Sequence, residues 1–376
     1  MNYLKMILIP VVIMSCSVTR AGDKQLLYLA SQQQKAIVAY EISNDSGELT
    51  RRFQFDMEGT PGAMTYSPDE SMIYVLLSGL ENGGAAAATV ARDQHGSLTL
   101  KGTAAVMGGS PYICCSLDGR CLLAAHYGAG EVTVYRITDG VCTEQLLDHR
   151  MTARTAHCIE LDPSGQFVFV PHTRPNRVDQ FRLDSNSGVL TPNTPPHVKG
   201  PDENHLYHEP RHYAHHPRLN MAYTANENGG GISAWKFDPK TGTLKLVQTL
   251  SSLPPGFDGQ SAGADIHITP DGRFAYVSNR DVTQRGEGDP QQDTLAGFAL
   301  DETTGRMKLT GHIATVELPR SFCIDTTGNF LFAGGQQTRE LFAYRIDQTT
   351  GELSLLKKYE SDGRTIWVMC GSVQAD

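Results

Sequence analysis

The sequence lacks the short motifs of several well-known enzyme classes. It has no P-loop, no GxGxxG before a helix, no GxSxG elbow, no HExxH and no CxxC pair. These absences argue against the usual routes to nucleotide binding, serine hydrolysis and zinc-peptidase chemistry. We therefore expect neither a metal nor a cofactor in this protein.

Charged and tryptophan residues are also scarce. Only 19% of the residues are charged, the net charge is −9, and there are two Trp residues. Because no basic stripe stands out, we do not expect a nucleic-acid partner. The 37 Gly and 19 Pro residues indicate a turn-rich all-β protein rather than a disordered chain. The eight cysteines are expected to be mostly buried free thiols, since several lie in apolar runs.

Long hydrophobic runs are absent except near the N-terminus. Lys5 precedes an apolar run over 6–14 that is too short to span a bilayer. This pattern predicts a signal peptide over residues 1–22 and a folded domain over 23–376. A lipoprotein signal with a lipid anchor at Cys16 is the alternative interpretation. We expect export to the periplasm or cell envelope, or a cytoplasmic location if the segment is not a working signal.

A short polar tag that ends in Gly and an apolar residue returns seven times. The copies lie at 43–49, 93–98, 138–142, 184–190, 238–244, 301–307 and 347–353. The glycines are separated by 44 to 63 residues, which is typical of a repeat architecture with strands between the tags. Tight turns such as 162–165 and 269–272 occur between the tags, with short apolar runs on both sides.

Four short strands per repeat predict a β-propeller blade. The first repeat begins at a second strand, 26–29, while the C-terminus carries an unmatched inner strand, 365–370. We therefore predict an all-β, seven-bladed β-propeller with four antiparallel strands per blade. The N- and C-terminal strands share one blade, which closes the ring and covers its edges.

The turns also give the register of the channel residues. His157, Arg211 and Arg320 begin inner strands, whereas Glu227 and Arg280 end second strands. Because the two strands are antiparallel, both positions lie at the same face of the ring. The sequence therefore predicts that these five residues surround one mouth of the central channel.

Those residue types suit acid–base chemistry on an anionic, oxygen-rich substrate. Arginine binds carboxylate or phosphate in a fork and keeps its charge, and arginines can stabilise a developing oxyanion. A carboxylate beside a histidine can move protons. The alternative is an internal salt-bridge ring that only holds the channel closed.

The segment 205–216 holds five histidines, but it lacks a recognised metal-ligand spacing. Rim and turn positions are the simpler interpretation of these residues. We expect Arg320, His212, Asp265 and His267 to help bind substrate.

Several stretches resemble the lactonase family of seven-bladed propellers, which is similar to propeller-type 6-phosphogluconolactonase and carboxy-cis,cis-muconate cyclase. The residues that carry the resemblance are 210–212 with 216–217, 225–227, 270–280 and 319–322. The resemblance implies that His157, Arg211, Glu227 and Arg280 carry the reaction.

The favoured hypothesis is a metal-independent lactonase, resembling 6-phosphogluconolactonase, that opens a small anionic sugar-acid lactone. Glu227 would be the general base, His157 its proton partner, and Arg211 and Arg280 the sites for the acidic tail and the oxyanion. The alternatives are a carboxymuconate-type cycloisomerase and a non-catalytic envelope propeller that binds a partner or a glycan. We expect a monomer.

Overall fold

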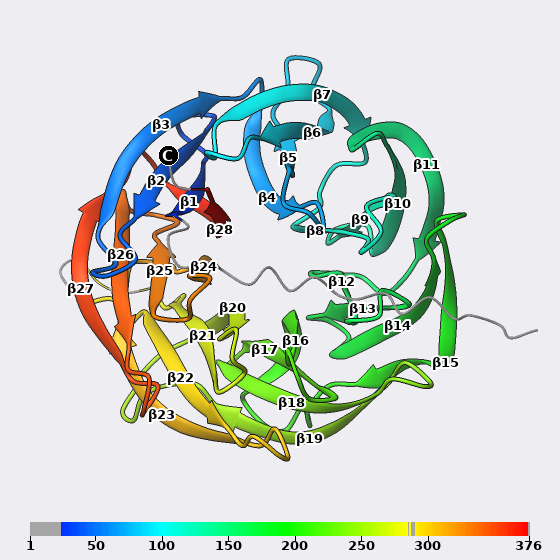
Figure 1. The fold of residues 1–376 in the computed structure, drawn as a ribbon. Coiled ribbons are helices and arrows are strands. Elements are labelled where there is room, and N and C mark those ends of the chain that lie inside the picture. The colour runs from blue at the N-terminus through cyan, green and yellow to red at the C-terminus, as the bar shows by residue number, and fades with distance from the viewer. Residues whose placement is uncertain (1–23, 285, 287–289, 375–376) are drawn as a thin grey trace, which may run out of the picture.

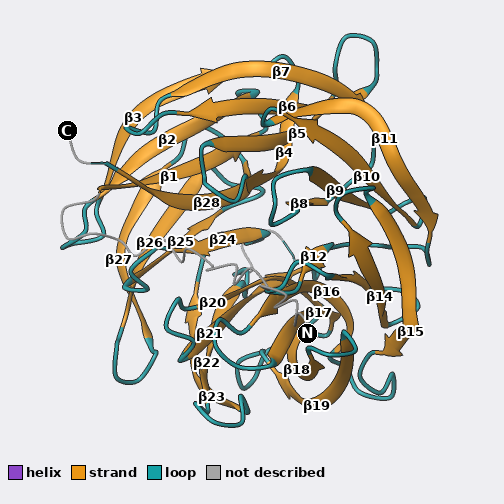
Figure 2. Ribbon diagram, turned by 45° about the vertical axis from the view of Figure 1, so that its right-hand side comes forward, coloured by secondary structure: helices purple, strands orange, loops and turns teal. Residues whose placement is uncertain are grey.

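The computed structural model describes residues 24–284, 286 and 290–374. The expected signal peptide and Cys16 lie outside these residues. Within the described ranges all regular elements are strands (Figure 2). No helix in these ranges has the length and apolarity needed to cross a bilayer. The predicted all-β class is confirmed.

The strands form seven antiparallel groups of four, arranged in a ring (Figure 1). Blade 1 contains β28 (Thr365–Val373), β1 (Lys24–Ser31), β2 (Ala36–Ile42) and β3 (Leu49–Asp56). Blade 2 contains β4 (Thr60–Tyr66), β5 (Met72–Ser78), β6 (Ala85–Arg92) and β7 (Leu98–Val106). Blade 3 contains β8 (Tyr112–Cys115), β9 (Cys121–His126), β10 (Glu131–Thr138) and β11 (Val141–Met151). Blade 4 contains β12 (Glu160–Leu161), β13 (Phe167–His172), β14 (Arg177–Asp184) and β15 (Val189–Lys199).

The remaining three blades complete the ring. Blade 5 contains β16 (His208–His215), β17 (Met221–Asn228), β18 (Gly231–Asp238) and β19 (Thr243–Ser251). Blade 6 contains β20 (Ser261–Ile268), β21 (Phe274–Asp281), β22 (Thr294–Leu300) and β23 (Met307–Ala314). Blade 7 contains β24 (Ser321–Ile324), β25 (Phe330–Gly334), β26 (Glu340–Ile346) and β27 (Leu353–Glu360). A single pairing of Asn228 with Ala262 links the sheets of blades 5 and 6.

The repeated tags form the turns between the third and fourth strands of the blades. All seven tag glycines have a positive φ, between 65° and 82°, a region that glycine adopts at little cost. A Cβ at Gly242 would lie 1.9 Å from the Phe167 ring of the preceding blade, so the turn also packs closely against its neighbour. The tag is therefore both a turn and a contact between blades.

Tyrosine hydroxyls fasten four of these turns to the preceding blade. Each hydroxyl donates a hydrogen bond to the carbonyl oxygen of a tag glycine, over 2.7 to 2.9 Å. The pairs are Tyr28–Gly96, Tyr74–Gly140, Tyr223–Gly305 and Tyr276–Gly351. The equivalent second-strand positions of blades 3, 4 and 7 hold Leu123, Phe169 and Phe332, which have no hydroxyl.

The hydrophobic core is distributed around the ring. Seven clusters of buried residues each join two neighbouring blades, including the interface between blades 7 and 1. Six of the described cysteines are buried, Cys370 is half-buried, and none of these seven forms a disulfide. Since each blade adds its own layer, the ring reaches its size without one large core.

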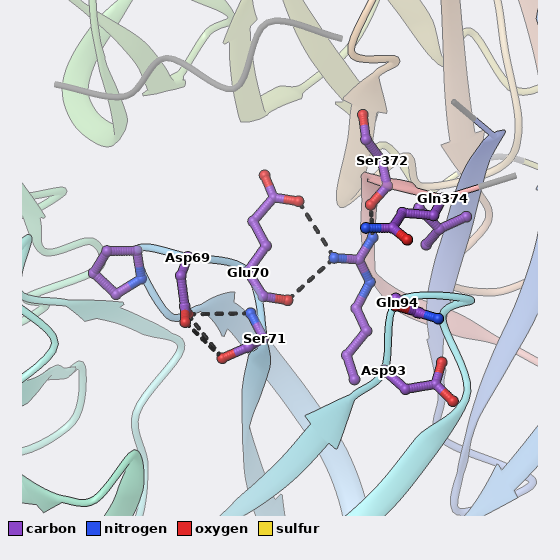
Figure 3. Close-up of a pocket in the computed structure, with 10 residues that line it drawn as sticks. Asp69, Glu70, Ser71, Asp93, Gln94, Ser372 and Gln374 are labelled. Carbon is purple, nitrogen blue, oxygen red and sulfur yellow. Dashed lines mark hydrogen bonds and ion pairs between the residues drawn. The ribbon is translucent and has the colours of Figure 1, made fainter. Parts of the chain in front are cut away.

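The last described strand closes blade 1, as predicted. β28 pairs antiparallel with β1, from Lys24–Val373 to Ser31–Thr365. Arg92 of blade 2 fastens this strand from the side. Its guanidinium donates to the carbonyl oxygens of Ser372 and Glu70, and to the Tyr28 hydroxyl. Arg92, Glu70 and Ser372 line a pocket of about 560 Å³ between an inner-strand turn at 68–71, a tag turn at 93–94 and the end of β28 (Figure 3). None of the predicted mouth residues lines this pocket.

Candidate active site

Register places the candidate residues at one mouth of the channel. Gly62, Pro111, His157 and Arg320, which begin inner strands, line two adjoining cavities of about 430 and 410 Å³. A third cavity of about 770 Å³ shares Tyr127 and Glu227 with its neighbour. Ser78, Thr173 and Gln336, which follow second strands or end them, also border these cavities. Of the five residues expected at this mouth, His157, Glu227 and Arg320 line these cavities, whereas Arg211 and Arg280 are buried and line none of the three.

The inner strands carry a one-residue bulge at the level of this mouth. In β16, Pro210 pairs with Asn226 but His212 pairs with Ala225, so Arg211 is the extra residue. The same irregularity occurs in β4 and in β20, between Gly263 and Ile266. Bulges re-aim side chains and are common next to active sites. Here the bulge allows consecutive residues, Arg211 and His212, both to be buried around the channel.

Glu227 lies between two guanidinium groups. Its Oε1 is 3.0 Å from Nη2 of Arg280 and 3.5 Å from Nε of Arg211. Burial alone would raise the pKa of Glu227, but Arg211 and Arg280 hold that pKa below its usual value. The carboxylate is therefore ionised at neutral pH, and it is a weak base.

The three arginines differ in how many of their donors are engaged. Arg280 donates to the carbonyl oxygens of Ala262 and Gly263 as well as to Glu227. Arg211 is completely buried and donates from Nη1 to the Ala264 carbonyl oxygen, over 2.6 Å, but its Nε and Nη2 have no hydrogen-bond acceptor. No hydrogen bond or ion pair of Arg320 is found within the described ranges.

This arrangement leaves an excess of positive charge at the mouth. Burial and the charges of Arg280 and Arg320 lower the pKa of Arg211, and burial and Arg280 lower the pKa of Arg320 to about 10. A guanidinium nevertheless stays protonated in a protein, so these shifts report charges that need an anion. The salt-bridge ring of the alternative interpretation would engage all three arginines. Among the described residues, however, Arg320 has no hydrogen bond or ion pair, and Nη2 of Arg211 has no acceptor although its Nε is ion-paired with Glu227.

His157 lines the cavity with Glu227 and Arg320. Burial and the nearby Arg211 lower the pKa of His157 well below its usual value, so the imidazole is neutral. Its Nδ1 is buried and has no hydrogen-bond partner in the described part of the chain, and Tyr127 packs edge-on against the ring with a centroid distance of 5.5 Å.

The structure places the other three expected residues behind this mouth. Nδ1 of His212 is 2.8 Å from Oδ1 of Asp265, and Nε2 of His267 is 3.4 Å from Oδ2 of the same carboxylate. His212 and Asp265 are buried, whereas the His267 side chain is 40% exposed. None of the three lines the cavities described above.

Two of the histidines in 205–216 have turn and packing roles. His216 accepts hydrogen bonds from the backbone N–H groups of Arg218 and Leu219 at Nδ1. The ring of His215 packs against Phe169 and Phe237. The simpler interpretation therefore holds for these two residues.

The sequence-based site omitted several aromatic and acidic neighbours. Tyr127 lines the mouth. It lies eight residues after the turn glycine, which is the position that Glu227 and Arg280 occupy in their own repeats, so the register could have identified it. The rings of Tyr112 and Trp367 lie 5.0 and 6.2 Å from the ring of His212. The Tyr112 hydroxyl donates to Oε1 of Glu160 over 2.6 Å. No pattern in the sequence singles out this contact.

Comparisons with known proteins identify the family of this chain. The family model described as a lactonase, 7-bladed β-propeller, matches residues 23–370. A 6-phosphogluconolactonase of Yersinia pestis (strain Pestoides F) is 32% identical over 351 residues, which are 93% of this chain and 99% of the relative. A 6-phosphogluconolactonase of Pectobacterium carotovorum is 31% identical over 348 residues, 92% of this chain and 98% of the relative.

Solved structures show the same fold. The periplasmic gluconolactonase of Pseudomonas aeruginosa superimposes with a TM-score of 0.80 at 21% identity, covering 94% of this chain and 100% of that one. A Lactobacillus plantarum protein gives a TM-score of 0.79 at 22% identity, covering 93% and 99%. The ring, the shared mouth and the match over 23–370 lead to one conclusion: this chain belongs to the lactonase family of seven-bladed β-propellers.

Proposed function

We propose that this protein hydrolyses the ester bond of a sugar-acid lactone, with 6-phosphoglucono-1,5-lactone or a related anionic lactone as substrate. The observation that carries the proposal is the excess of guanidinium groups over carboxylates at a mouth that also holds a neutral histidine. The relatives named 6-phosphogluconolactonase, similar over nearly the whole chain, support the same reaction.

The arginines match the charge changes of lactone opening. Attack of water on the carbonyl carbon places negative charge on the carbonyl oxygen, and the product carries a carboxylate. Preorganised cationic donors stabilise such charge most strongly where water is excluded. Arg320 lines the cavity and can donate to the oxyanion or to an acidic group of the substrate. The buried Arg211 adds positive charge behind the cavity, and Glu227 and backbone carbonyls hold Arg280 in place.

Glu227 and His157 take the remaining positions at the cavity. The ionised Glu227 fixes the two guanidinium groups, and its Oε2, unlike Oε1, makes no hydrogen bond within the described ranges. It can therefore accept a hydrogen bond from the attacking water. His157, neutral and beside the same cavity, can exchange a proton with the substrate.

The test is proton release from a panel of lactones by the purified protein, corrected for the spontaneous rate in buffer. We expect turnover of 6-phosphoglucono-1,5-lactone, glucono-1,5-lactone or a close relative, and a loss of at least about 100-fold in Arg211→Ala and Arg280→Ala. The exposed Arg52 of β3, which pairs with Glu41 of β2, provides the control variant Arg52→Ala. A wild-type rate equal to that of buffer for every lactone would refute the proposal.

We further propose that the protein is exported, because residues 1–22 have the pattern of a signal peptide. A structurally similar protein is named a periplasmic gluconolactonase. Cell fractionation, together with mass spectrometry of the N-terminal peptide of the protein isolated from cells, tests this proposal. Cleavage near residue 22 or lipidation at Cys16 supports it, whereas an intact N-terminus in the cytoplasmic fraction contradicts it.

A further inference from the structure

The three cavities of the mouth differ in the charged side chains that line them. Glu227 lines two of them, and Arg174 and Glu209 also line the largest one. Among the described residues that line the cavity of about 430 Å³ there is no carboxylate, and Arg320 is the single charged side chain. We call this the blade 2 cavity, because residues of β4, of β5 and of the start of β6 form much of its wall. A negatively charged group therefore meets the least repulsion in the blade 2 cavity.

The loop between β7 and β8, residues 107–111, forms another part of that wall. Gly109 has a φ of 74°, and a Cβ built on it would meet no atom within 4 Å, so this part of the loop faces open space. The carbonyl oxygen of Gly108 lies 3.0 Å from Nδ1 of His126. The carbonyl oxygen of Gly109 accepts a hydrogen bond from the backbone N–H of Tyr127 over 3.2 Å. Both carbonyl groups therefore point toward the end of β9 in blade 3.

These carbonyl contacts fix the direction of two backbone N–H groups. Both peptide bonds are trans, and in a trans peptide the N–H points opposite to the C=O of the same unit. The N–H groups of Gly109 and Ser110 therefore both point away from β9, and neither donates a hydrogen bond within the described ranges. The Ser110 hydroxyl donates to the Tyr112 carbonyl oxygen over 2.9 Å, which further holds the loop. Successive N–H groups that point the same way form an anion-binding concavity.

The largest cavity is a poorer place for a negatively charged group. Its one basic residue in the described ranges is Arg174, whose side chain is 80% exposed and whose Nε lies 3.6 Å from Oε1 of Glu209. Glu227 lines the same cavity, so two carboxylates would repel an anion there. The exposed apolar side chains of Leu206 and Val282 offer it no hydrogen bond.

We propose that the phosphate group of a sugar-phosphate lactone binds in the blade 2 cavity, held by the guanidinium of Arg320 and the N–H groups of Gly109 and Ser110. The inference rests on the proposed function and adds the orientation of the substrate. A phosphate monoester has three terminal acceptor oxygens and a charge of about −1.5 to −2 at pH 7, which match one cation and two N–H donors. Arg320, Gly109 and Ser110 also line the cavity that holds His157 and Glu227, so the two cavities adjoin. The lactone carbonyl carbon can then lie beside those two side chains.

The experiment compares Gly109→Asp with Gly109→Asn. Both side chains tolerate a positive φ and have nearly the same size, so they differ mainly in charge. The measured quantity is the selectivity, defined as kcat/KM for 6-phosphoglucono-1,5-lactone divided by kcat/KM for the uncharged glucono-1,5-lactone. Gly109→Asp should lower the selectivity at least about tenfold relative to Gly109→Asn, because its carboxylate repels the phosphate and not the uncharged lactone. Equal selectivities of the two variants would contradict the inference.

Gly256→Asp is the matched control. Gly256 has a φ of 81°, a Cβ built on it would meet no atom within 4 Å, and its neighbour Phe257 lines the largest cavity. The substitution adds the same charge on the other side of the mouth and should keep the selectivity within about twofold of wild type. A loss of selectivity in Gly256→Asp and none in Gly109→Asp would place the phosphate in the largest cavity and overturn the inference. Thermal unfolding of each variant shows whether it is folded.

Binding of the two reaction products gives a readout that does not depend on turnover. By calorimetry, 6-phosphogluconate should bind wild type at least about tenfold more tightly than gluconate, and Arg320→Met should remove most of this difference. In NMR spectra, 6-phosphogluconate should shift the amide signals of Gly109 and Ser110, whereas gluconate should not. Equal affinities, or unshifted amide signals, would overturn the inference and leave the lactonase proposal standing. Selective binding of 6-phosphogluconate without turnover of any lactone would refute the lactonase proposal alone.

Discussion

At the scale of single residues, the arginines of the mouth differ in whether a carboxylate or carbonyl oxygen offsets their positive charge. Arg280 is fully held by Glu227 and two carbonyl oxygens, whereas Arg320 has no hydrogen bond or ion pair in the described part of the chain. An unmatched cation near the surface of a cavity destabilises the free protein and is useful once an anion binds. Removing the charge of Arg320 should therefore raise the stability of the free protein and lower its activity.

Replacing Arg320 by methionine should raise the Tm and lower kcat/KM for an anionic lactone by roughly 10- to 100-fold. The magnitude corresponds to losing one charge-assisted hydrogen bond of about 1.5 to 3 kcal/mol. Scanning calorimetry and steady-state kinetics measure the two effects. Arg345→Met, an exposed arginine on β26, serves as the control and should leave kcat/KM unchanged. A lower Tm with unaltered kinetics would show that Arg320 is structural.

Glu160 should make the protein less stable as the pH rises. Burial raises the pKa of this carboxyl to about 7, above the value of about 4.3 in an unfolded chain. Between these values the native state holds a proton that the unfolded state has lost, so stability falls with rising pH. Glu160→Gln should remove this loss.

The gain from Glu160→Gln above pH 7 should be on the order of 1 kcal/mol, because the side chain retains some exposure. Urea unfolding at pH 5 and pH 8 measures it. The difference between the two pH values should shrink in the variant; an unchanged difference would mean that other groups cause the pH dependence.

At the scale of the strands, the bulges decide which side chains meet. The turn register predicted Arg211, Glu227 and Arg280 correctly as neighbours, since it depends only on counting from Pro and Gly. The contact of His212 with Asp265 could not be predicted in this way. In a regular strand, consecutive side chains face opposite sides, and the extra residue in β16 and in β20 breaks that alternation.

Close approach of two blades at Gly263 supports the site. A Cβ there would lie 2.1 Å from the carbonyl oxygen of Asn226, and the Gly263 carbonyl accepts from Arg280. Gly263→Ala should therefore separate β17 from β20, loosen the Glu227–Arg280 pair, and lower stability by roughly 1 to 3 kcal/mol and kcat/KM at least tenfold.

The control for Gly263→Ala is Gly311→Ala on β23. A Cβ at Gly311 would meet no atom within 4 Å. Urea unfolding and kcat/KM should both remain close to wild type for this control. Equal effects of the two substitutions would contradict the role assigned to the approach at Gly263.

At the scale of the molecule, stability depends on sealing the ring. The repeated tags and the unmatched inner strand were enough to predict seven blades and a shared blade 1. They could not predict the contacts of Arg92, which joins Tyr28, Glu70 and Ser372 from three distant parts of the sequence. Such a convergence depends on the folded ring and leaves no periodic signal.

Arg92→Ala should destabilise the protein by about 3 to 5 kcal/mol, because it removes one partner from a buried charged network. The loss should be concentrated at β28, where amide hydrogen exchange should accelerate more than in β18. Mass spectrometry of peptides after exchange measures this difference. Arg52→Ala, which breaks an exposed ion pair with Glu41, should leave both strands unaffected. Uniform acceleration around the ring would contradict a local role.

The shared blade also affects how the protein is made. During translation, β1 emerges early but lacks its inner neighbour until β28 leaves the ribosome at the other end of the chain. The ring of the nascent polypeptide therefore stays open for most of its synthesis, because β1 has no strand to pair with on its inner side until β28 has been made. The ring can close only after the final strand has been made, so any passage of the chain through a pore is easiest before that strand pairs with β1.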